Sequence, residues 1–478
     1  MTDPEVAAGT VIRVGALSTT IFVVQFLVAL DVSLVNIALP DIADDLGFGD
    51  SALQWVVSAY LLTFAGFMLL GGRLGDLVGR RRVVLVGSTL FAAASVLGGL
   101  AWNAPLLLIA RAVQGLAGAL LAPAALALVT EVPEGRQRRR ALGLWSAAGA
   151  GGGAVGVVLS GLLTHAFGWR AVMFVNVPIV IVGLVAAYRL PSHRLTLTDR
   201  RLDFAGACLA TLGVGSLVYA ASAAADSGWT AASVVAGFVC ATVFLFLFVF
   251  TESRVAHPLM PLRLFRVRSV VGANVFGFML CAGQLAAFYF VSLYIQKVWG
   301  VASDVAGFMF LPFCFFVVIG IALAIKVAAA IGPRFTLAVF GVVGAMGLAG
   351  FALMPTQVAF WTGVVLPSAL GGIGIGGSMV VQGAAAIAGV EPGDAGIASG
   401  VLNAARQLGG TLGLAVLVTI AATATATASS TASSEALMAG AGYSLGLAVA
   451  AGLLILGSVL AVLIVPSHAS TRAENRSR

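Results

Sequence analysis

The stretch Ala29-Leu-Asp-Val-Ser-Leu-Val-Asn-Ile-Ala-Leu-Pro40 closes an apolar run that begins near Leu17. About 20 apolar residues cross a bilayer as a helix, so this run is long enough to span one. Asp31 lies inside the run. A carboxylate in hydrocarbon is costly, and such a group usually faces a cavity or a partner and serves function. The stretch therefore predicts a transmembrane helix with a functional acid.

Two interpretations of Asp31 remain open from the sequence. A buried carboxyl group can hold and release a proton near neutral pH, as proton-coupled transport requires. Alternatively, Asp31 reaches the membrane surface, because it lies only a few turns from the outer end of the helix.

The composition identifies a polytopic membrane protein. Of the 478 residues, 60% are hydrophobic and 9% are charged, whereas soluble domains carry about 25% charged residues. Fourteen apolar segments are candidate spans. They lie near 14–39, 51–72, 83–101, 105–130, 140–164, 169–189, 203–223, 231–251, 269–296, 302–325, 334–354, 358–381, 397–421 and 440–465.

The basic residues indicate how these spans are oriented. The net charge is +7, which by itself is also typical of nucleic-acid binders. Of the 26 basic residues, only Arg170 and Lys297 fall in one set of alternating loops, and Arg111 and Arg406 fall within spans. Because Lys and Arg accumulate in cytoplasmic loops, the other loops and both termini are predicted to be cytoplasmic, and no nucleic-acid partner is expected.

The remaining chemistry argues against an enzyme. The cysteines and histidines are scattered, so neither a disulfide framework nor a metal site is indicated, and no cofactor is expected. The loops are too short for a soluble catalytic domain. Gly372-Ile-Gly-Ile-Gly-Gly377 lies inside a span without the context of a nucleotide-binding loop, so it predicts helix packing. Ala421–Gly442, rich in Ala, Thr and Ser, is expected to be a flexible outer loop.

The second predicted span ends in Gly72-Arg-Leu-Gly-Asp-Leu-Val-Gly-Arg-Arg-Arg82. This motif resembles the cytoplasmic signature of the major facilitator superfamily, a loop that latches the two halves of the transporter. Glycines permit a tight turn and close helix approach, and an acid can face the positive end of another helix. The alternative is an ordinary basic loop. The matching residues are Gly72, Leu74, Asp76, Gly79, Arg80 and Arg81, and Leu77 stands where the family has a basic residue.

Further motifs resemble one subfamily, the fourteen-helix drug:proton antiporters. Arg111-Ala-Val-Gln-Gly-Leu-Ala-Gly118 matches its fourth-helix motif. The resemblance makes Arg111 the buried counter-charge of Asp31, because a buried arginine needs a partner; the alternative places Arg111 near the outer surface. Other matches are Leu30–Pro40, Gln54–Tyr60, Trp169–Pro178 and Ala398–Gly410.

The resemblance implies an all-α polytopic membrane protein with the major facilitator fold, built from two six-helix bundles plus two extra central helices. The expected division is an N-terminal bundle over 1–190, the extra helices over 191–267, a C-terminal bundle over 268–466 and a cytoplasmic tail over 467–478. The two halves are expected to be degenerate repeats. Aligning Gly332 with Gly79 puts Ala329 at the place of Asp76, so gating by charge is expected to rest on the first half.

The fifth predicted span departs from the antiporter pattern. Val157 occupies the position of a proline in the family motif, and Ser160 occupies that of a glycine. The small residues of Gly149–Gly161 still permit tight helix packing. The departure weakens the link of this motif to antiport.

The substrate cavity of such a fold lies near the membrane midplane, between the two halves. Aromatic side chains offer stacking and cation–π contacts there. Packing or lipid contact is the more common role for each of them. The substrate-binding candidates are Asn36, Gln54, Trp55, Tyr60, Tyr289 and Tyr294, with Gln284, Phe288 and Gln382 as further polar or aromatic residues.

The favoured function is proton-coupled efflux of hydrophobic small molecules across the bacterial inner membrane by a monomer. Asp31 would bind proton and substrate in alternation. A major facilitator transporter dedicated to one small metabolite is the alternative. A sensor or a channel is a third class, but the sequence lacks the continuous polar stripe or repeated filter of a channel.

The charge pattern generates a prediction about topology. Cysteines introduced into the loops at Arg80–Arg82, Arg136–Arg140 and Arg263–Arg268 should resist an impermeant thiol reagent added outside intact cells, because these loops are predicted to be cytoplasmic. Labelling of any of the three loops would contradict the fourteen-span arrangement.

Overall fold

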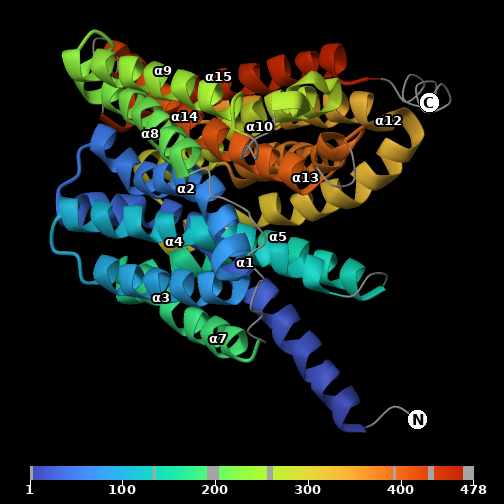
Figure 1. Ribbon diagram of the computed structural model, residues 1–478. Helices are drawn as coiled ribbons and strands as arrows, with labels where there is room; N and C mark the ends of the chain where they lie inside the picture. The colour runs from blue at the N-terminus through green and yellow to red at the C-terminus, as the bar shows by residue number, and fades with distance from the viewer. Residues whose placement is uncertain are drawn as a thin grey trace. The chain divides into compact units, whose positions relative to one another are not determined.

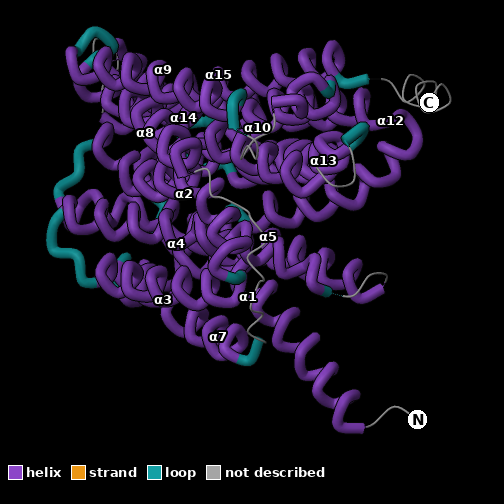
Figure 2. The backbone as a smooth tube through the Cα atoms, viewed as in Figure 1, coloured by secondary structure: helices purple, strands orange, loops and turns teal. Residues whose placement is uncertain are grey.

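The computed structural model describes residues 4–132, 136–190, 204–255, 262–390, 395–428 and 435–466. Nearly all of these residues are helical, and no strand occurs among them (Figures 1 and 2). The predicted tail, 467–478, lies outside the described residues. The chain forms two compact units, Met1–Leu212 and Gly213–Arg478, called unit 1 and unit 2 below. Because their boundary falls inside one helix, the division of the chain proposed from the sequence stays a prediction.

Unit 1 contains seven helices and the beginning of an eighth among its described residues. They are α1 (Pro4–Leu46), α2 (Asp50–Val78), α3 (Arg80–Gly99), α4 (Ala104–Glu131), α5 (Arg136–Phe167), α6 (Arg170–Phe174), α7 (Asn176–Tyr188) and α8 (Phe204–Ser227).

Unit 2 continues with long helices joined by short helical turns. They are α9 (Ala232–Glu252), η1 (Leu262–Arg266), α10 (Arg268–Leu293), η2 (Tyr294–Val298), α11 (Ser303–Met309), α12 (Leu311–Ala352), η3 (Phe360–Val365), α13 (Leu366–Ile387), α14 (Ala395–Ala428) and α15 (Glu435–Ile464).

The helices account for the predicted spans. In the described part of the chain, 10 helices are long and apolar enough to cross a membrane, and shorter apolar helices occur at Ala52–Met68, Gly151–Phe167 and Ala205–Ala221. The longest segment, Ser303–Ala352, is broken at Gly332, where φ is 77° and ψ is 167°. It therefore covers the two predicted spans 302–325 and 334–354, and each of the fourteen predicted spans has a helix.

The surface agrees with a membrane environment. Large apolar side chains are exposed on many helices and turns, including Leu353 at 82%, Trp361 at 73% and Phe246 at 68%. Soluble monomers rarely leave such extensive apolar surface in water, whereas a bilayer covers it at no cost.

One loop prediction was wrong. The segment Ala421–Gly442 is mostly helical, because α14 continues to Ala428 and α15 begins at Glu435; residues 429–434 lie outside the described part. The threonines are compatible with the extension. The hydroxyls of Thr423, Thr425 and Thr427 each donate to the carbonyl four residues earlier, at 2.9–3.0 Å, so they satisfy their own hydrogen bonding within a helix.

Unit 1 is held together by close helix pairs. α1 packs on α5, and α2 packs on α4, which also contacts α3; α3 in turn contacts α7, an order that can be followed in Figure 1. The α1–α5 contact depends on glycine. A Cβ at Gly152 would lie 2.6 Å from the Phe26 carbonyl oxygen, and a Cβ at Gly156 would lie 2.8 Å from that of Leu30. The glycine-rich stretch of α5 therefore lies against the part of α1 that contains Asp31.

In unit 2, glycines likewise allow the close approach of α12 and α13. A Cβ at Gly374 would overlap the backbone of Gly344, and a Cβ at Gly376 would overlap the carbonyl of Val317. The Gly372–Gly377 motif is thus a helix-packing surface, as predicted.

Neighbouring glycines of α5 provide a matched test of this packing. Gly152→Ala should lower the apparent melting temperature, because the added methyl group overpacks against α1 at a cost of about 1–3 kcal/mol. Gly151→Ala should leave it equal or slightly higher, because nothing lies within 4 Å of that position and alanine favours the helix. Thermal unfolding in detergent, followed by tryptophan fluorescence, measures both. Equal shifts in the two variants would contradict the close α1–α5 approach.

Candidate functional site

Asp31 and Arg111 form an ion pair in the interior of unit 1. Asp31 lies on α1, Arg111 lies on α4, and Arg111 Nη1 donates to Asp31 Oδ2 at 2.7 Å. The two side chains are 0% and 1% exposed, respectively. Neither reaches the surface, so the alternative positions considered from the sequence, a snorkelling Asp31 and an Arg111 near the outer surface, do not apply. The two charges compensate each other where an isolated charge would be strongly unfavourable.

Two amide side chains complete the surroundings of the carboxylate. Asn176 Nδ2 donates to Asp31 Oδ1 at 2.8 Å, and Gln114 Nε2 approaches the same oxygen at 3.4 Å. Gln114 also accepts from Arg111 Nη1 at 2.9 Å and donates to Ser95 Oγ at 2.9 Å. All five side chains are buried. Both oxygens of Asp31 are therefore hydrogen-bonded.

A third helix, α2, contacts the arginine from another side. Arg111 Nε donates to the Val56 carbonyl at 3.0 Å, and the guanidinium lies 4.6 Å from the centre of the Tyr60 ring. The ring face attracts a cation. Tyr60, a predicted substrate contact, is thus a direct neighbour of the ion pair.

The motif Arg111–Gly118 positions these groups through its spacing. Arg111 and Gln114 are three residues apart, so they lie on the same face of α4. A Cβ at Gly115 would overlap the Tyr60 carbonyl, and a Cβ at Gly118 would lie 2.9 Å from the Tyr60 hydroxyl. These glycines allow α2 to approach closely enough for Tyr60 to cover the guanidinium.

No individual role was predicted for Asn176, Gln114 or Ser95. Asn176 is the first residue of α7, and Val175 separates it from α6. Pro178 follows within the first turn of α7, where a proline is tolerated. The available signal for Asn176 in the sequence was a polar residue in an otherwise apolar segment. The direction of its side chain toward Asp31, however, depends on the packing of α7 against α1.

Two buried atoms beside the ion pair have no hydrogen-bond partner within the described part of the chain. They are the Tyr60 hydroxyl and Asn176 Oδ1. Buried polar atoms are nearly always paired, so these two are free to bind a water molecule or a polar group of a ligand. They give the site hydrogen-bonding capacity beyond the ion pair itself.

Ser160 explains one departure from the antiporter motif. Its hydroxyl donates to the carbonyl of Leu34 on α1, and the side chain is fully buried. The residue that replaces a family glycine therefore joins α5 to α1, close to the ion pair.

The predicted gating motif is partly described. Gly79 separates α2 from α3 with φ 98°, a conformation that favours glycine. Arg80 donates to the Ala127 carbonyl of α4 at 2.6 Å. Arg81 donates to the carbonyls of Ala187 and Tyr188, the last two residues of α7, at 3.3 and 2.8 Å. These arginines satisfy carbonyl groups near helix C-termini, where a cation is favoured.

Gly72 and Asp76 are two further residues of the motif, and the close helix contact that the motif predicts is not found at Gly72. A Cβ at Gly72 would only reach ordinary contact with Pro123, whereas one at Gly71 would overlap the Ala119 carbonyl. The tight helix approach is therefore at Gly71, a position that the motif does not mark. The side chain of Asp76 lies outside the described residues.

The other predicted substrate contacts are distributed over both units. Asn36 donates to the Val32 carbonyl of its own helix at 2.9 Å. Gln54 is buried in α2, and Trp55 is half-buried. In unit 2, Tyr289 is buried in α10, and the Tyr294 hydroxyl donates to the Met354 carbonyl at 2.9 Å. Tyr294 therefore already has a structural contact at the end of α10.

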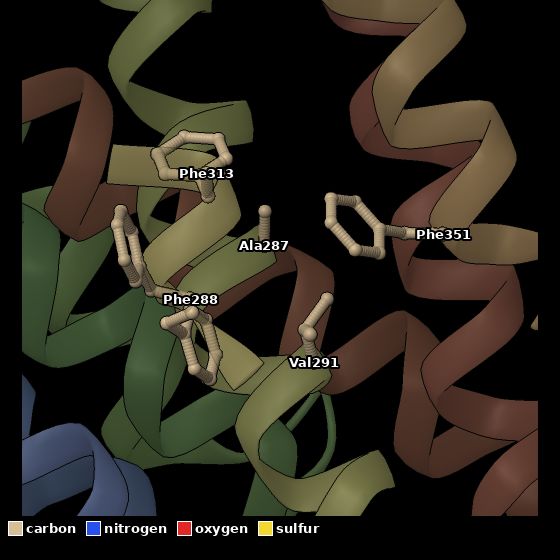
Figure 3. A pocket seen from close by; sticks show the side chains of 6 residues that line it. Ala287, Phe288, Val291, Phe313 and Phe351 are labelled. Atoms are coloured by element: carbon tan, nitrogen blue, oxygen red, sulfur yellow. The ribbon is translucent and has the colours of Figure 1, made fainter. Parts of the chain in front are cut away.

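A small apolar pocket in unit 2 does not resemble a binding site. It is lined by Ala287, Phe288, Val291, Phe310, Phe313 and Phe351 and has an empty volume of about 220 Å³. Figure 3 shows Phe351 pointing toward Ala287 from a separate helical segment. Small-molecule sites usually include polar groups, whereas this pocket is lined by apolar side chains. Phe288 stacks on Phe310 at 5.6 Å between ring centres, so its role here is packing.

Taken together, these features define a multi-pass helical membrane protein with a buried ion pair inside one bundle. The family model of the Major Facilitator Superfamily matches residues 21–414, and the chain belongs to this superfamily. Members are transporters, so the protein is a multi-pass membrane transporter of small molecules, and the expectation that it is not an enzyme is confirmed.

Named relatives extend over most of the chain. It is 38% identical to the puromycin resistance protein of Streptomyces alboniger over 469 residues, which cover 96% of this chain and 92% of the relative. It is 40% identical to the cephamycin export protein of Amycolatopsis lactamdurans over 403 residues, 83% of this chain and 82% of the relative.

Solved structures agree on the fold. A bacterial homologue of the human lysosomal transporter Spinster, in an inward-facing conformation, matches with a TM-score of 0.68 and 15% identity over 98% of both chains. The POT family transporter PepTSo matches with a TM-score of 0.69 and 14% identity over 97% of this chain and 98% of its own. The predicted major facilitator fold is thereby confirmed.

The ion pair yields a stability prediction. Arg111→Gln should lower the apparent melting temperature strongly, because an unpaired buried charge costs about 3–5 kcal/mol. The double variant Asp31→Asn/Arg111→Gln should recover a large part of the loss, because it removes both charges. Thermal unfolding at neutral pH compares wild type, single and double variants. A single variant as stable as wild type would show that the pair does not constrain this fold.

Proposed function

We propose that the protein is a proton-coupled exporter of hydrophobic small molecules, including antibiotics. It acts as a monomer in the bacterial inner membrane, with both termini in the cytoplasm. The observation that carries the proposal is the fully buried Asp31–Arg111 pair inside transmembrane helices. The resistance and export functions in the names of its relatives support the choice of substrate class.

The pair suggests how a proton gradient is used. Protonation of Asp31 removes its charge and weakens its bond to Arg111, so the network of Asn176 and Gln114 must rearrange. Binding of substrate and binding of a proton then compete for the same buried group. One charge crossing the membrane gains about 2.3 kcal/mol per 100 mV, which supports export against a concentration gradient.

The gating role belongs to the α2–α3 motif. Gly72, Asp76, Gly79, Arg80 and Arg81 act as the cytoplasmic latch. The bonds of Arg80 and Arg81 to carbonyls of α4 and α7 support this role, because they couple the motif to the ends of two helices.

Substrate contacts are assigned to polar and aromatic residues of both units. They are Asn36, Gln54, Trp55, Tyr60, Tyr289 and Tyr294. Tyr60 has the strongest support, because it touches Arg111 and its hydroxyl has no partner among the described residues.

A transporter dedicated to one compound is the second candidate. It is favoured by the names of the puromycin and cephamycin relatives, each of which refers to one antibiotic. A drug-susceptibility panel in a pump-deficient host separates the two, because a dedicated exporter protects against one chemical class alone.

The coupling role of Asp31 can be tested directly. In proteoliposomes with an imposed pH gradient, Asp31→Asn should reduce gradient-driven accumulation of rhodamine 123 to background, because asparagine cannot release a proton. Passive equilibration should persist. Asp44→Asn is the matched control, since Asp44 is an exposed acid on the same helix. Gradient-driven accumulation equal to wild type in the Asp31 variant would place coupling elsewhere.

A further inference from the structure

A second arginine lies within an apolar span of unit 2, and this one has no counter-charge among the described residues. Arg406 lies on α14, inside the segment Gly400–Thr427, and is partly buried. Its Nε and Nη2 donate to Gln382 Oε1 at 3.2 and 2.8 Å, and Nη2 also donates to the Met379 carbonyl at 3.0 Å. Both partners are neutral. No carboxylate forms an ion pair with Arg406 in the described part of the chain.

The acceptor of Arg406 is held in a fixed place. Gln382 on α13 is 0% exposed, and its Nε2 donates to the Ala273 carbonyl of α10 at 3.3 Å. This bond directs Oε1 toward the guanidinium. Gly277 on α10 leaves the necessary room, because a Cβ there would overlap Gln382 Nε2. Three helices therefore cooperate to position one positive charge.

This arrangement leaves binding capacity unused. A guanidinium carries five N–H donors, and Nη1 of Arg406 makes no hydrogen bond to any described residue. Neutral acceptors do not cancel the charge, and a cation within a membrane span is costly unless an anion compensates it. If the only role of Arg406 were to join α14 to α13, a neutral hydrogen-bond donor would be sufficient. The retained charge therefore points to a ligand with an anionic group, and guanidinium is well suited to carboxylates.

We propose that Arg406 binds the carboxylate of the carried molecule, so that the transported class includes amphipathic organic acids and zwitterions. Gln382 is the positioning residue, since it fixes the guanidinium without meeting the substrate charge. The inference rests on the proposed export function and adds to it a charge preference in unit 2.

Two dyes of the same shape test the proposal. Rhodamine 110 carries a free carboxylate, and rhodamine 123 is its methyl ester. Binding to the purified full-length protein is measured by fluorescence anisotropy in nanodiscs of phosphatidylcholine. Arg406→Gln should weaken rhodamine 110 about tenfold, the usual effect of losing a charged hydrogen bond. Binding of rhodamine 123 should stay within about twofold of wild type. Arg406→Lys, which keeps the positive charge, should weaken the binding of rhodamine 110 less than Arg406→Gln does.

The control is Lys326→Gln, which removes an exposed positive charge from α12 of the same unit and should change neither dye. Equal loss of both dyes in the Gln and Lys variants would make Arg406 a structural residue and overturn the proposal. The proposal would also be overturned if phosphatidylglycerol stayed bound to the purified wild-type protein, was lost only in Arg406→Gln, and the protein showed no preference between the dyes. The ligand of Arg406 would then be a lipid phosphate. Wild-type binding of the ester alone would refute the anion site but leave export intact. Binding of neither dye would count against the proposed function itself and remove this inference with it.

Discussion

The need to compensate a buried charge organises unit 1. Asp31 and Arg111 come from helices far apart in sequence and meet at 2.7 Å with no access to solvent. The pair can form only if α1 and α4 come together, and the amides of Gln114 and Asn176 then tie α3 and α7 to the same point through Ser95 and Asp31. Glycines in α4 let α2 approach Arg111 closely, and glycines in α5 let that helix approach α1. Packing and electrostatics therefore impose one arrangement on the bundle.

The arginines of this protein illustrate three ways of placing a cation in a helical membrane protein. Arg111 is neutralised by a carboxylate and covered by an aromatic ring. Arg80 and Arg81 lie at helix ends and donate to backbone carbonyls, where the helix dipole favours them. Arg406 has neutral acceptors, and no carboxylate in the described part of the chain compensates its charge. The differences follow from local partners rather than from residue type, so the function of a membrane arginine has to be derived from its surroundings.

Sequence reasoning found the elements whose physics is local. Hydropathy located the spans, because a run of about twenty apolar residues forms few structures other than a transmembrane helix. The Asp31–Arg111 pair was predicted from the family motif together with the rule that buried charges need partners. Sequence reasoning missed Asn176, since the direction of an amide on a helix depends on rotation set by neighbouring helices. The assignment of Tyr294 to the substrate stays a prediction, and the structure adds that its hydroxyl donates to the Met354 carbonyl. Sequence reasoning also treated Ala421–Gly442 as a loop, because it did not consider that threonine hydroxyls can be satisfied within a helix.

The link between α2 and α3 has a consequence for how this chain can change over evolution. Gly79 is the only residue between the two helices, and it holds a backbone conformation that other residues rarely adopt. Inserting or deleting a residue in this non-helical link would change the direction and rotation of α3, and this would turn Ser95 away from Gln114. We therefore expect related chains to retain both the one-residue length of this connection and its glycine.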